Sequence, residues 1–262
     1  MRKIILAFQF LTIIPMQQDT GNVSDEDMGK TTAVFPVVGF AEGVVLAFLA
    51  ALLLKVFPAE LTNALLVLML VIMNGGFHLD GLSDTFDAVA SRGDRAKKLE
   101  IMKDSSVGPM GVIAIVMTLL LKYVLLNAVS FESTSVTYLM TVLAMPLLSR
   151  WSMVTAAFYS SPARKDGLGR LFIEHTGSRQ LILATAAVMV LMALVCIMVS
   201  EYSFLIFYVM FAMPVLYAFS FGAVWFFRKM FDGMTGDSFG AVNELAVLIF
   251  LLSAVINNTG PV

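Results

Sequence analysis

Long apolar stretches recur along almost the whole chain, and short polar connections separate them. Seven of these stretches approach the roughly 20 residues that a helix needs to cross the hydrocarbon core of a bilayer. The predicted spans cover residues 35–56, 60–77, 108–129, 136–158, 180–200, 203–227 and 240–258. In lipid, backbone N–H and C=O groups must be paired within helices or a closed β-barrel. No stretch alternates apolar and polar residues as barrel strands do, so a helical bundle is predicted. The pattern predicts an all-α, polytopic bundle of about seven transmembrane helices in a lipid bilayer.

A shorter apolar segment, residues 2–15, precedes the first span. It is too short to cross a bilayer, and no small-residue cleavage site precedes the polar residues 17–27. We interpret it as a helix that lies in the membrane interface, with an uncleaved signal-like start as the alternative. No internal repeat or low-complexity linker interrupts the chain, so we expect residues 1–262 to form a single transmembrane domain.

Composition supports lipid as the solvent for most of the chain. Hydrophobic residues make up 59% of it and charged residues 14%, and the mean hydropathy is +0.87, values outside those of ordinary soluble domains. The single cysteine, Cys196, excludes an intramolecular disulfide and a multi-cysteine metal site. We expect no nucleic acid among the partners, and the sequence leaves a homo-oligomer open.

Basic residues predict the orientation, because cytoplasmic loops carry an excess of Lys and Arg. A cytoplasmic N-terminus and an external C-terminus place the basic residues of the connections on the cytoplasmic side, with Lys55 as the exception. The external connections are short turns, whereas three cytoplasmic connections are longer and hold most of the reactive polar side chains. We therefore expect the active site at the cytoplasmic edge.

The richest of these connections, residues 75–111, begins with three carboxylates at intervals of four and three. On a helix, Asp80, Asp84 and Asp87 fall within a wedge of roughly 60° on one face. Like charges so close together repel one another, and a hard divalent cation such as Mg²⁺ relieves that repulsion with oxygen ligands. The spacing thus favours a metal site on this segment.

A second carboxylate pair, Glu100 and Asp104, follows at a helical spacing of four, with Lys103 beside it. Two carboxylate-bearing helix ends could hold one or two cations that bridge a pyrophosphate, while basic residues balance its remaining charge. The alternative is a set of solvated loop charges in local pairs. Five carboxylates in register, flanked by glycines that allow close backbone approach, favour the metal site.

Polar residues inside the predicted spans are costly in lipid and usually face a cavity or one another. Asn243 and Glu244, just inside the last span, favour contact with substrate over hydrogen bonding between helices. Glu42 and Arg150 either pair or line an entry path. His78 is interpreted as a hydrogen-bonded structural residue, because hard cations prefer oxygen ligands.

The acidic spacing resembles the signature of the CDP-alcohol phosphotransferase superfamily. Asp84 and Asp87 are followed by Arg92, and Glu100 is followed by Asp104. The sequence departs from that signature in its shorter gap and at Ala88, Ser91, Ala96 and Glu100.

A closer resemblance is to the cobalamin synthase family, a distant relative of that superfamily. Six blocks carry it, in order along nearly the whole chain: FLTIIP from Phe10, FPVVG from Phe35, GGFHLDGLSDTFDA from Gly75, LEIMKDSSVGPMG from Leu99, RKDGLGRLF from Arg164 and GMTGDSFGAVNEL from Gly233. This resemblance implies that a ribose hydroxyl of α-ribazole, or of its 5′-phosphate, attacks the cobinamide-side phosphorus of adenosylcobinamide-GDP. GMP leaves and a cobalamin forms, at the cytoplasmic (inner) membrane of a prokaryote.

The resemblance also implies residue roles. Asp84, Asp87 and Glu100 correspond to metal ligands, and Asp104 corresponds to the base for the attacking hydroxyl, close to the metal; Asp80 adds a ligand or supports one. Asp84, Asp87 and Asp104 are thus the implied catalytic residues, with Mg²⁺ as the implied metal. Apart from the resemblance, the residues expected to contact the substrates are Arg92, Lys103, Arg164, Arg170, Asp237 and Glu244. For Arg164 and Arg170, an anchoring role in a basic cytoplasmic loop is an equal alternative.

Two other functions stay open. Glu42, Arg150 and Glu244 could form the ion path of a cation-coupled transporter, although no repeated halves are evident and the carboxylates cluster at one edge. A CDP-alcohol phosphatidyltransferase would perform the same chemistry on a lipid alcohol. Release of GMP separates the first of these from the transferase, and exchange of the donor separates the second.

Overall fold

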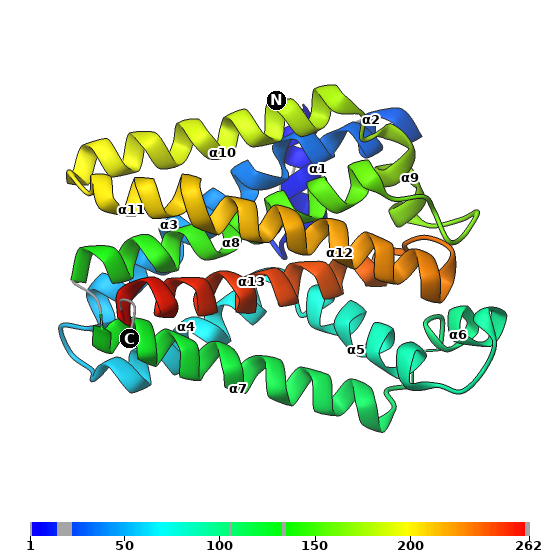
Figure 1. Cartoon of the computed structure of the whole chain (residues 1–262), viewed down its shortest axis with the longest axis horizontal. Coiled ribbons are helices and arrows are strands. Elements are labelled where there is room, and N and C mark those ends of the chain that lie inside the picture. The colour runs from blue at the N-terminus through cyan, green and yellow to red at the C-terminus, as the bar shows by residue number, and fades with distance from the viewer. Residues whose placement is uncertain (1, 15–22, 105, 133–134, 260–262) are drawn as a thin grey trace.

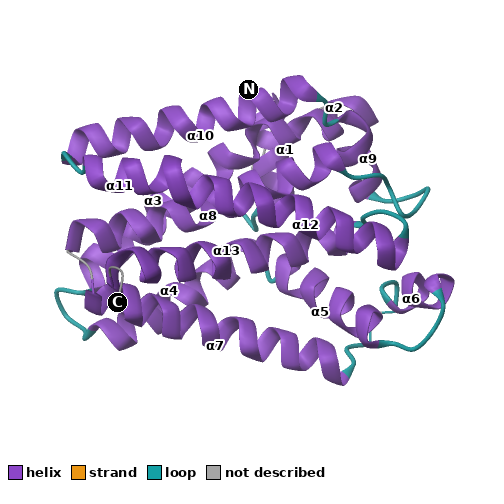
Figure 2. Cartoon of the chain, in the orientation of Figure 1, coloured by secondary structure: helices purple, strands orange, loops and turns teal. Residues whose placement is uncertain are grey.

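The structure is a computed structural model that describes residues 2–14, 23–104, 106–132 and 135–259. Helices dominate this part of the chain, and it contains no strand, only an isolated bridge between Pro162 and Met234 (Figure 2). The helices are α1 (Arg2–Leu11), α2 (Asp25–Gly29), η1 (Lys30–Val34), α3 (Phe35–Leu53), α4 (Ala59–Asn74), α5 (Phe77–Ala90), α6 (Arg95–Ile101), α7 (Pro109–Glu132), α8 (Ser135–Tyr159), α9 (Leu168–His175), α10 (Ser178–Val199), α11 (Tyr202–Phe207), η2 (Tyr208–Ala212), α12 (Met213–Phe231) and α13 (Gly236–Thr259). The predicted all-α class is confirmed.

Six helical segments of the described chain are long and apolar enough to cross a membrane. They are Asp25–Leu53, Pro109–Phe131, Ser135–Tyr159, Ser178–Val199, Tyr202–Phe231 and Gly236–Asn258. The pair α4 and α5 passes the same test together and would make a seventh span, broken by a bend of 89°. The chain is therefore a multi-pass membrane protein.

The second predicted span, residues 60–77, was wrong as a continuous helix. Helix α4 ends at Asn74, because Gly75 and Gly76 adopt φ values of 61° and 75°, a left-handed conformation that glycine adopts without steric cost. The chain then turns into α5 at Phe77. The bend aims α5 along the bundle beside α7 and α13 (Figure 1).

The N-terminal helix is also shorter than residues 2–15, since α1 ends at Leu11; Pro15 lies outside the described residues. Helix α1 buries Ile5, Leu6 and Leu11 and packs against η1 and α3. Its predicted position in the membrane interface stays a prediction.

Helix α8 lies at the centre of the bundle, and nearly all of its membrane-spanning part is buried. It packs against α3, α10, α12 and α13. Gly39 and Gly43 of α3 lie against the carbonyl groups of Pro146 and Leu143 so closely that a Cβ at either glycine would clash. Small residues at such contacts allow helix backbones to approach in membranes.

The longer connections gather at one end of the bundle, where α6, α9 and the start of α13 lie (Figure 1). The α10–α11 turn and the C-terminal end of α13 lie at the other end. This arrangement brings the polar motifs of three separate connections together.

Candidate active site

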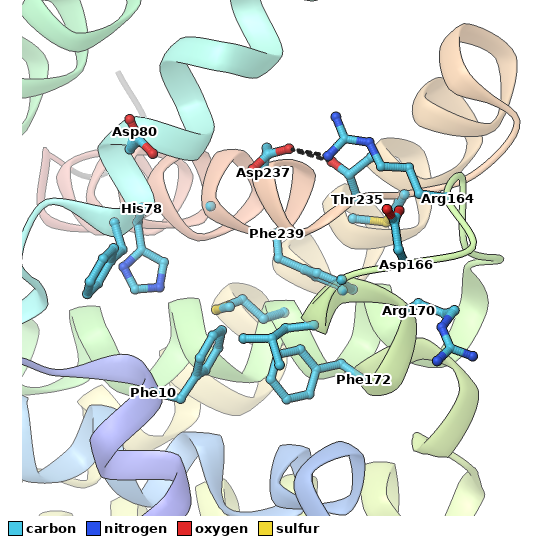
Figure 3. A pocket seen from close by; sticks show the side chains of 18 of the residues that line it. Phe10, His78, Asp80, Arg164, Asp166, Arg170, Phe172, Thr235, Asp237 and Phe239 are labelled. Carbon is cyan, nitrogen blue, oxygen red and sulfur yellow. Dashed lines mark hydrogen bonds and ion pairs between the residues drawn. The ribbon is translucent and has the colours of Figure 1, made fainter. Parts of the chain in front are cut away.

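A cavity of about 510 Å³ opens among α1, α5, α8, α9 and the start of α13 (Figure 3). Four predicted site residues line it: Asp80, Arg164, Arg170 and Asp237. The side chains that prediction missed include Phe10, Asp166, Phe172, Thr235 and Phe239. All five lie inside the sequence blocks that carry the family resemblance, and membership of a block is the signal that could have identified them.

The start of α13 is fixed by reciprocal hydrogen bonds. The backbone N–H of Ser238 donates to Thr235 Oγ1 at 3.2 Å, and the N–H of Thr235 donates to Ser238 Oγ at 3.3 Å. Thr235 Oγ1 also donates to Asp237 Oδ2 at 3.2 Å. Asp237 is thereby held in the first turn of a helix, where a carboxylate is favoured by the helix dipole.

Arg164 joins the loop after α8 to this helix start. Its Nη1 donates to Asp237 Oδ2 at 3.3 Å, and its Nη2 donates to the carbonyl of Leu99 at 3.0 Å. Its Nε is buried and has no hydrogen-bond partner within the described structure. This donor is enclosed by protein atoms, so the hydrogen bonds of Nη1 and Nη2 are what fix the guanidinium in the cavity wall.

The same loop is tied to the segment before α13 by backbone hydrogen bonds. Ala163 N donates to Met234 O at 2.9 Å, and Met234 N donates to Ser161 O at 2.8 Å. Gly233, with φ of 157°, lies so close to this loop that a Cβ would clash. The loop position that Arg164 needs thus depends on glycine in the GMTGD block.

Helix α5 approaches α13 closely through glycine. A Cβ at Gly81 would meet the Asp237 backbone at 2.8 Å, and one at Gly240 would meet the His78 carbonyl at 2.9 Å. This contact places Asp84 where the charges of Asp80, Asp237 and Asp87 all act unfavourably on its carboxylate.

The chemistry of this carboxylate group fits a hard divalent cation. Asp80, Asp84, Asp87 and Asp237 supply only oxygen donors, and Arg164 is the cation that acts favourably on Asp84. Within the described residues, no three His, Cys, Asp or Glu side chains form a ready-made metal-binding group. Mg²⁺ therefore stays a prediction, supported by the charge excess and by the donor type.

Asp87 also caps the start of α7. Its Oδ2 accepts from Gly108 N at 2.7 Å, and its Oδ1 accepts from Gly111 N at 2.8 Å. A Cβ at Gly108 would meet Asp87 Oδ1 at 2.5 Å, and one at Gly111 would be closer still to the carboxylate. The VGPMG segment thus needs its glycines to bring this helix start to the carboxylate.

The expectation that Glu100 and Asp104 share a helical face was wrong, because α6 ends at Ile101 and Asp104 lies beyond it. Glu100 is exposed and bonds to Lys97 at 3.0 Å. Asp104 Oδ1 accepts from Ser106 N at 3.1 Å, and this hydrogen bonding holds the pKa of the Asp104 carboxyl below its ordinary value. Neither lines the cavity, and their predicted roles stay predictions.

The remaining predicted basic residues differ in their positions. Arg170 lines the cavity, and its guanidinium pairs with Glu174 at 2.9 Å while its Nε is buried without a hydrogen-bond partner. Lys103 pairs with Asp166, a cavity residue, at 3.4 Å. Arg92 is exposed after the end of α5, outside the cavity wall.

A buried polar network lies directly behind the cavity. Arg150 Nη2 donates to both carboxylate oxygens of Glu42, at 3.1 and 3.2 Å, and also bonds to Asn74. Its Nη1 donates to His78 Nε2 at 2.6 Å and to Asn243 Oδ1 at 2.8 Å. Of the two alternatives for Glu42 and Arg150, the structure shows the pair, and the hydrogen-bonded role of His78 is confirmed.

Glu244 completes this network through a residue that sequence reasoning missed. Its carboxylate pairs with Lys122 of α7, and it accepts from Asn243 Nδ2 at 3.2 Å. Lys122 and Glu244 line a second cavity, of about 10 Å³, and the contact of Glu244 with substrate stays a prediction. The missed signal was Lys122 itself, since a lone charge inside a span requires a partner.

Comparison with known proteins agrees with the family resemblance. A model of the family "Cobalamin-5-phosphate synthase" matches residues 3–255. A relative from Geotalea daltonii is 37% identical, with 97% of both chains covered; one from Desulfitobacterium hafniense is 36% identical, covering 97% of this chain and 96% of the relative. A third, from Thermodesulfovibrio yellowstonii, is 31% identical over 95% of this chain and 94% of its own. All three are named adenosylcobinamide-GDP ribazoletransferase.

No solved structure matches the chain. The family match spans the carboxylates of α5, the loop that carries Arg164 and the start of α13. It therefore includes every element that forms the charged wall of the cavity. The chain belongs to the cobalamin-5-phosphate synthase family.

Proposed function

We propose that this protein is an adenosylcobinamide-GDP ribazoletransferase, which joins α-ribazole or its 5′-phosphate to adenosylcobinamide-GDP. The products are GMP and adenosylcobalamin, or adenosylcobalamin 5′-phosphate. The observation that carries the proposal is the family match over residues 3–255, together with a cavity in which carboxylates and arginines of three connections meet. Neither a transporter nor a lipid phosphatidyltransferase is favoured by that match.

In this reaction a hydroxyl oxygen of the acceptor forms a bond to the cobinamide-side phosphorus. The bond from that phosphorus to the oxygen of GMP breaks, and GMP leaves with the electron pair. The hydroxyl proton needs a base within hydrogen-bond reach. We assign this role to Asp80, because it lines the cavity and is exposed there, whereas the Asp237 carboxylate is engaged by Arg164 and Thr235.

The arginines of the cavity suit the phosphates of the donor. Arg164 and Arg170 both line the cavity, and guanidinium groups bind phosphate oxygens through paired donors. These side chains would orient the pyrophosphate and stabilise the negative charge that GMP carries away.

The carboxylates around Asp84 would hold Mg²⁺. The charge of Asp237 acts on Asp84, and Asp87 adjoins Asp84 on the same helix, so these three carboxylates would hold the ion while Asp80 stays free as the base. A bound Mg²⁺ would supply charge neutralisation for the pyrophosphate. Without it, the negative charge of these carboxylates would oppose the binding of a negatively charged donor.

We further propose that the cavity end of the bundle faces the cytoplasm of a prokaryotic cell, in its cytoplasmic membrane. Basic residues support this orientation, because Arg95 at the start of α6, Arg164 in the loop after α8 and Arg228 in the last turn of α12 lie at that end. The nucleotide-activated donor would then reach the cavity from the compartment in which nucleotides are made.

Release of GMP tests the proposal directly. Purified protein in detergent is given adenosylcobinamide-GDP, α-ribazole and Mg²⁺, for wild type, Asp84→Asn and the control Glu60→Gln, which changes an exposed carboxylate in the first turn of α4. We expect metal-dependent release by wild type and Glu60→Gln, and loss of at least about 100-fold in Asp84→Asn. No release by wild type with any divalent metal would refute the proposal.

A further inference from the structure

The two ends of the large cavity differ in chemistry. Figure 3 shows Asp80, Asp237 and Arg164 along one side, and Phe10 and Phe172 together on the other, with Phe239 between them. All of these residues line the same cavity. A ligand that fills it must therefore combine an apolar part with a polar part.

The apolar end is built from rings that are held in place. Phe172 and Phe239 are 3% and 5% exposed, and the ring centroids of Phe10 and Phe172 lie 4.8 Å apart. Phe35 supports both rings from behind, at 6.1 Å from Phe10 and 5.3 Å from Phe172. Met153, also in the wall and 3% exposed, adds an apolar thioether. The partly exposed ring of Phe10, held by these buried side chains, is a preformed surface for a flat, apolar group.

Size narrows the possible ligands. A volume of about 510 Å³ lies within the roughly 300–1,000 Å³ typical of sites for drug-sized molecules. One nucleoside or nucleoside monophosphate fills such a space, whereas a corrin macrocycle with its side chains is much larger. We therefore place the corrinoid outside this cavity and compare the acceptor nucleoside and the guanosine of the donor as its occupant.

The two nucleosides differ in the edges of their bases. Guanine carries hydrogen-bond donors and acceptors around its ring, and each one buried against Phe or Met without a partner is costly. The dimethylbenzimidazole base of α-ribazole has an apolar edge with two methyl groups. His78, a polar residue of the wall, already accepts from Arg150 at its Nε2. The aromatic side of the wall thus suits the acceptor base better than guanine, whereas the polar side chains of Asp166 and Thr235 lie toward Arg164 (Figure 3).

Building on the proposed function, we infer that this cavity is the acceptor site, in which the base of α-ribazole packs against Phe10, Phe172 and Phe239. The ribose then points toward Asp80 and Asp237 at the charged end. This placement makes the aromatic residues the determinants of which lower-ligand base the enzyme accepts. It also leaves the guanosine of the donor to a surface outside the cavity.

The test compares Phe172→Leu and Phe10→Leu with wild type and with the control Phe207→Leu, a 6% exposed residue of α11 that does not line the cavity. Leucine keeps an apolar side chain but removes the flat ring. The KM values for α-ribazole and for adenosylcobinamide-GDP are measured separately, and α-ribazole binding without donor is measured by calorimetry. Thermal unfolding in detergent confirms that each variant is folded.

We expect the two cavity variants to raise the KM and the Kd for α-ribazole about tenfold, within the range for loss of base stacking, and to change the donor KM less than twofold. We also expect them to lose preference for α-ribazole over an acceptor with a purine base. A raised donor KM would instead assign the cavity to guanosine, and no change in either KM would place both bases elsewhere. Absence of GMP release by wild type would be a failure of the proposed function and not of this assignment.

Discussion

Around Arg150, inside the bundle, each charged side chain has a partner of opposite sign, whereas around Asp84, at the end of the bundle, carboxylates face carboxylates. The inner network contains the pairs Glu42–Arg150 and Lys122–Glu244, all at most 4% exposed in their side chains. Its formal charges cancel, as burial in a membrane requires. The excess negative charge at the end of the bundle lies where solvent or a ligand can compensate it. This difference in charge balance distinguishes the structural network from the reactive site.

The largest expected effect comes from leaving one inner charge without its partner. Arg150→Met should lower the free energy of unfolding by about 3–5 kcal/mol, because Glu42 would stay buried and uncompensated. Thermal and denaturant unfolding of the purified protein in detergent measure this loss. The double variant Glu42→Gln/Arg150→Met should recover a large part of it, and a single variant as stable as wild type would show that the pair is dispensable.

At the end of the bundle, the expected effect is on activity instead of stability. Asp80→Asn should reduce kcat at least about 100-fold, because an amide cannot accept the hydroxyl proton, while the unfolding midpoint changes little at this exposed position. The measurement is the rate of GMP release at saturating donor and acceptor. A normal kcat in Asp80→Asn would show that Asp80 is not the base. Asp237→Asn would then be the next variant to assay.

Removal of the Asp87 side chain should cost less stability than Arg150→Met, because its carboxylate caps the start of helix α7. Asp87→Ala should lower the free energy of unfolding by about 1–2 kcal/mol, since two N–H groups at the start of α7 lose their acceptor. Asp94→Ala is a matched cap removal at the short, exposed α6, where Asp94 accepts from Lys97 N at 2.9 Å, and it should cost less. Equal losses would show that the cap of α7 carries no tertiary role.

Sequence alone predicted the spans well, because the length of an apolar run fixes what a bilayer can contain. It could not predict the bend between α4 and α5, since Gly75 and Gly76 are compatible with either a continuous or a broken helix. The direction of α5 depends on tertiary contacts such as Gly81 against the Asp237 backbone. Such contacts join residues more than 150 positions apart.

The candidate site was predictable as a set of motifs but not as a geometry. Asp80 and Asp237 were both expected at the site, yet their closeness follows from helix packing that no local spacing encodes. The assumption of one helix through Glu100 and Asp104 failed because α6 ends at Ile101. Lys122 was missed because one charge in a long apolar stretch hardly lowers its mean hydropathy, although its burial beside Glu244 is what the membrane demands.

The smallest expected effect on stability comes from breaking an ion pair that is exposed to solvent. Arg95 and Asp232 join α6 to the end of α12 at 2.6 Å, with side chains 49% and 64% exposed. Water and salt already stabilise each charge when the pair is broken, so Arg95→Met should change the free energy of unfolding by less than about 1 kcal/mol. The same unfolding measurement that detects the loss in Arg150→Met serves here, at low and at high salt. A loss comparable to that of Arg150→Met would mean that charge pairing stabilises this bundle regardless of burial, and the distinction between the inner network and the reactive end would then have to rest on chemistry alone.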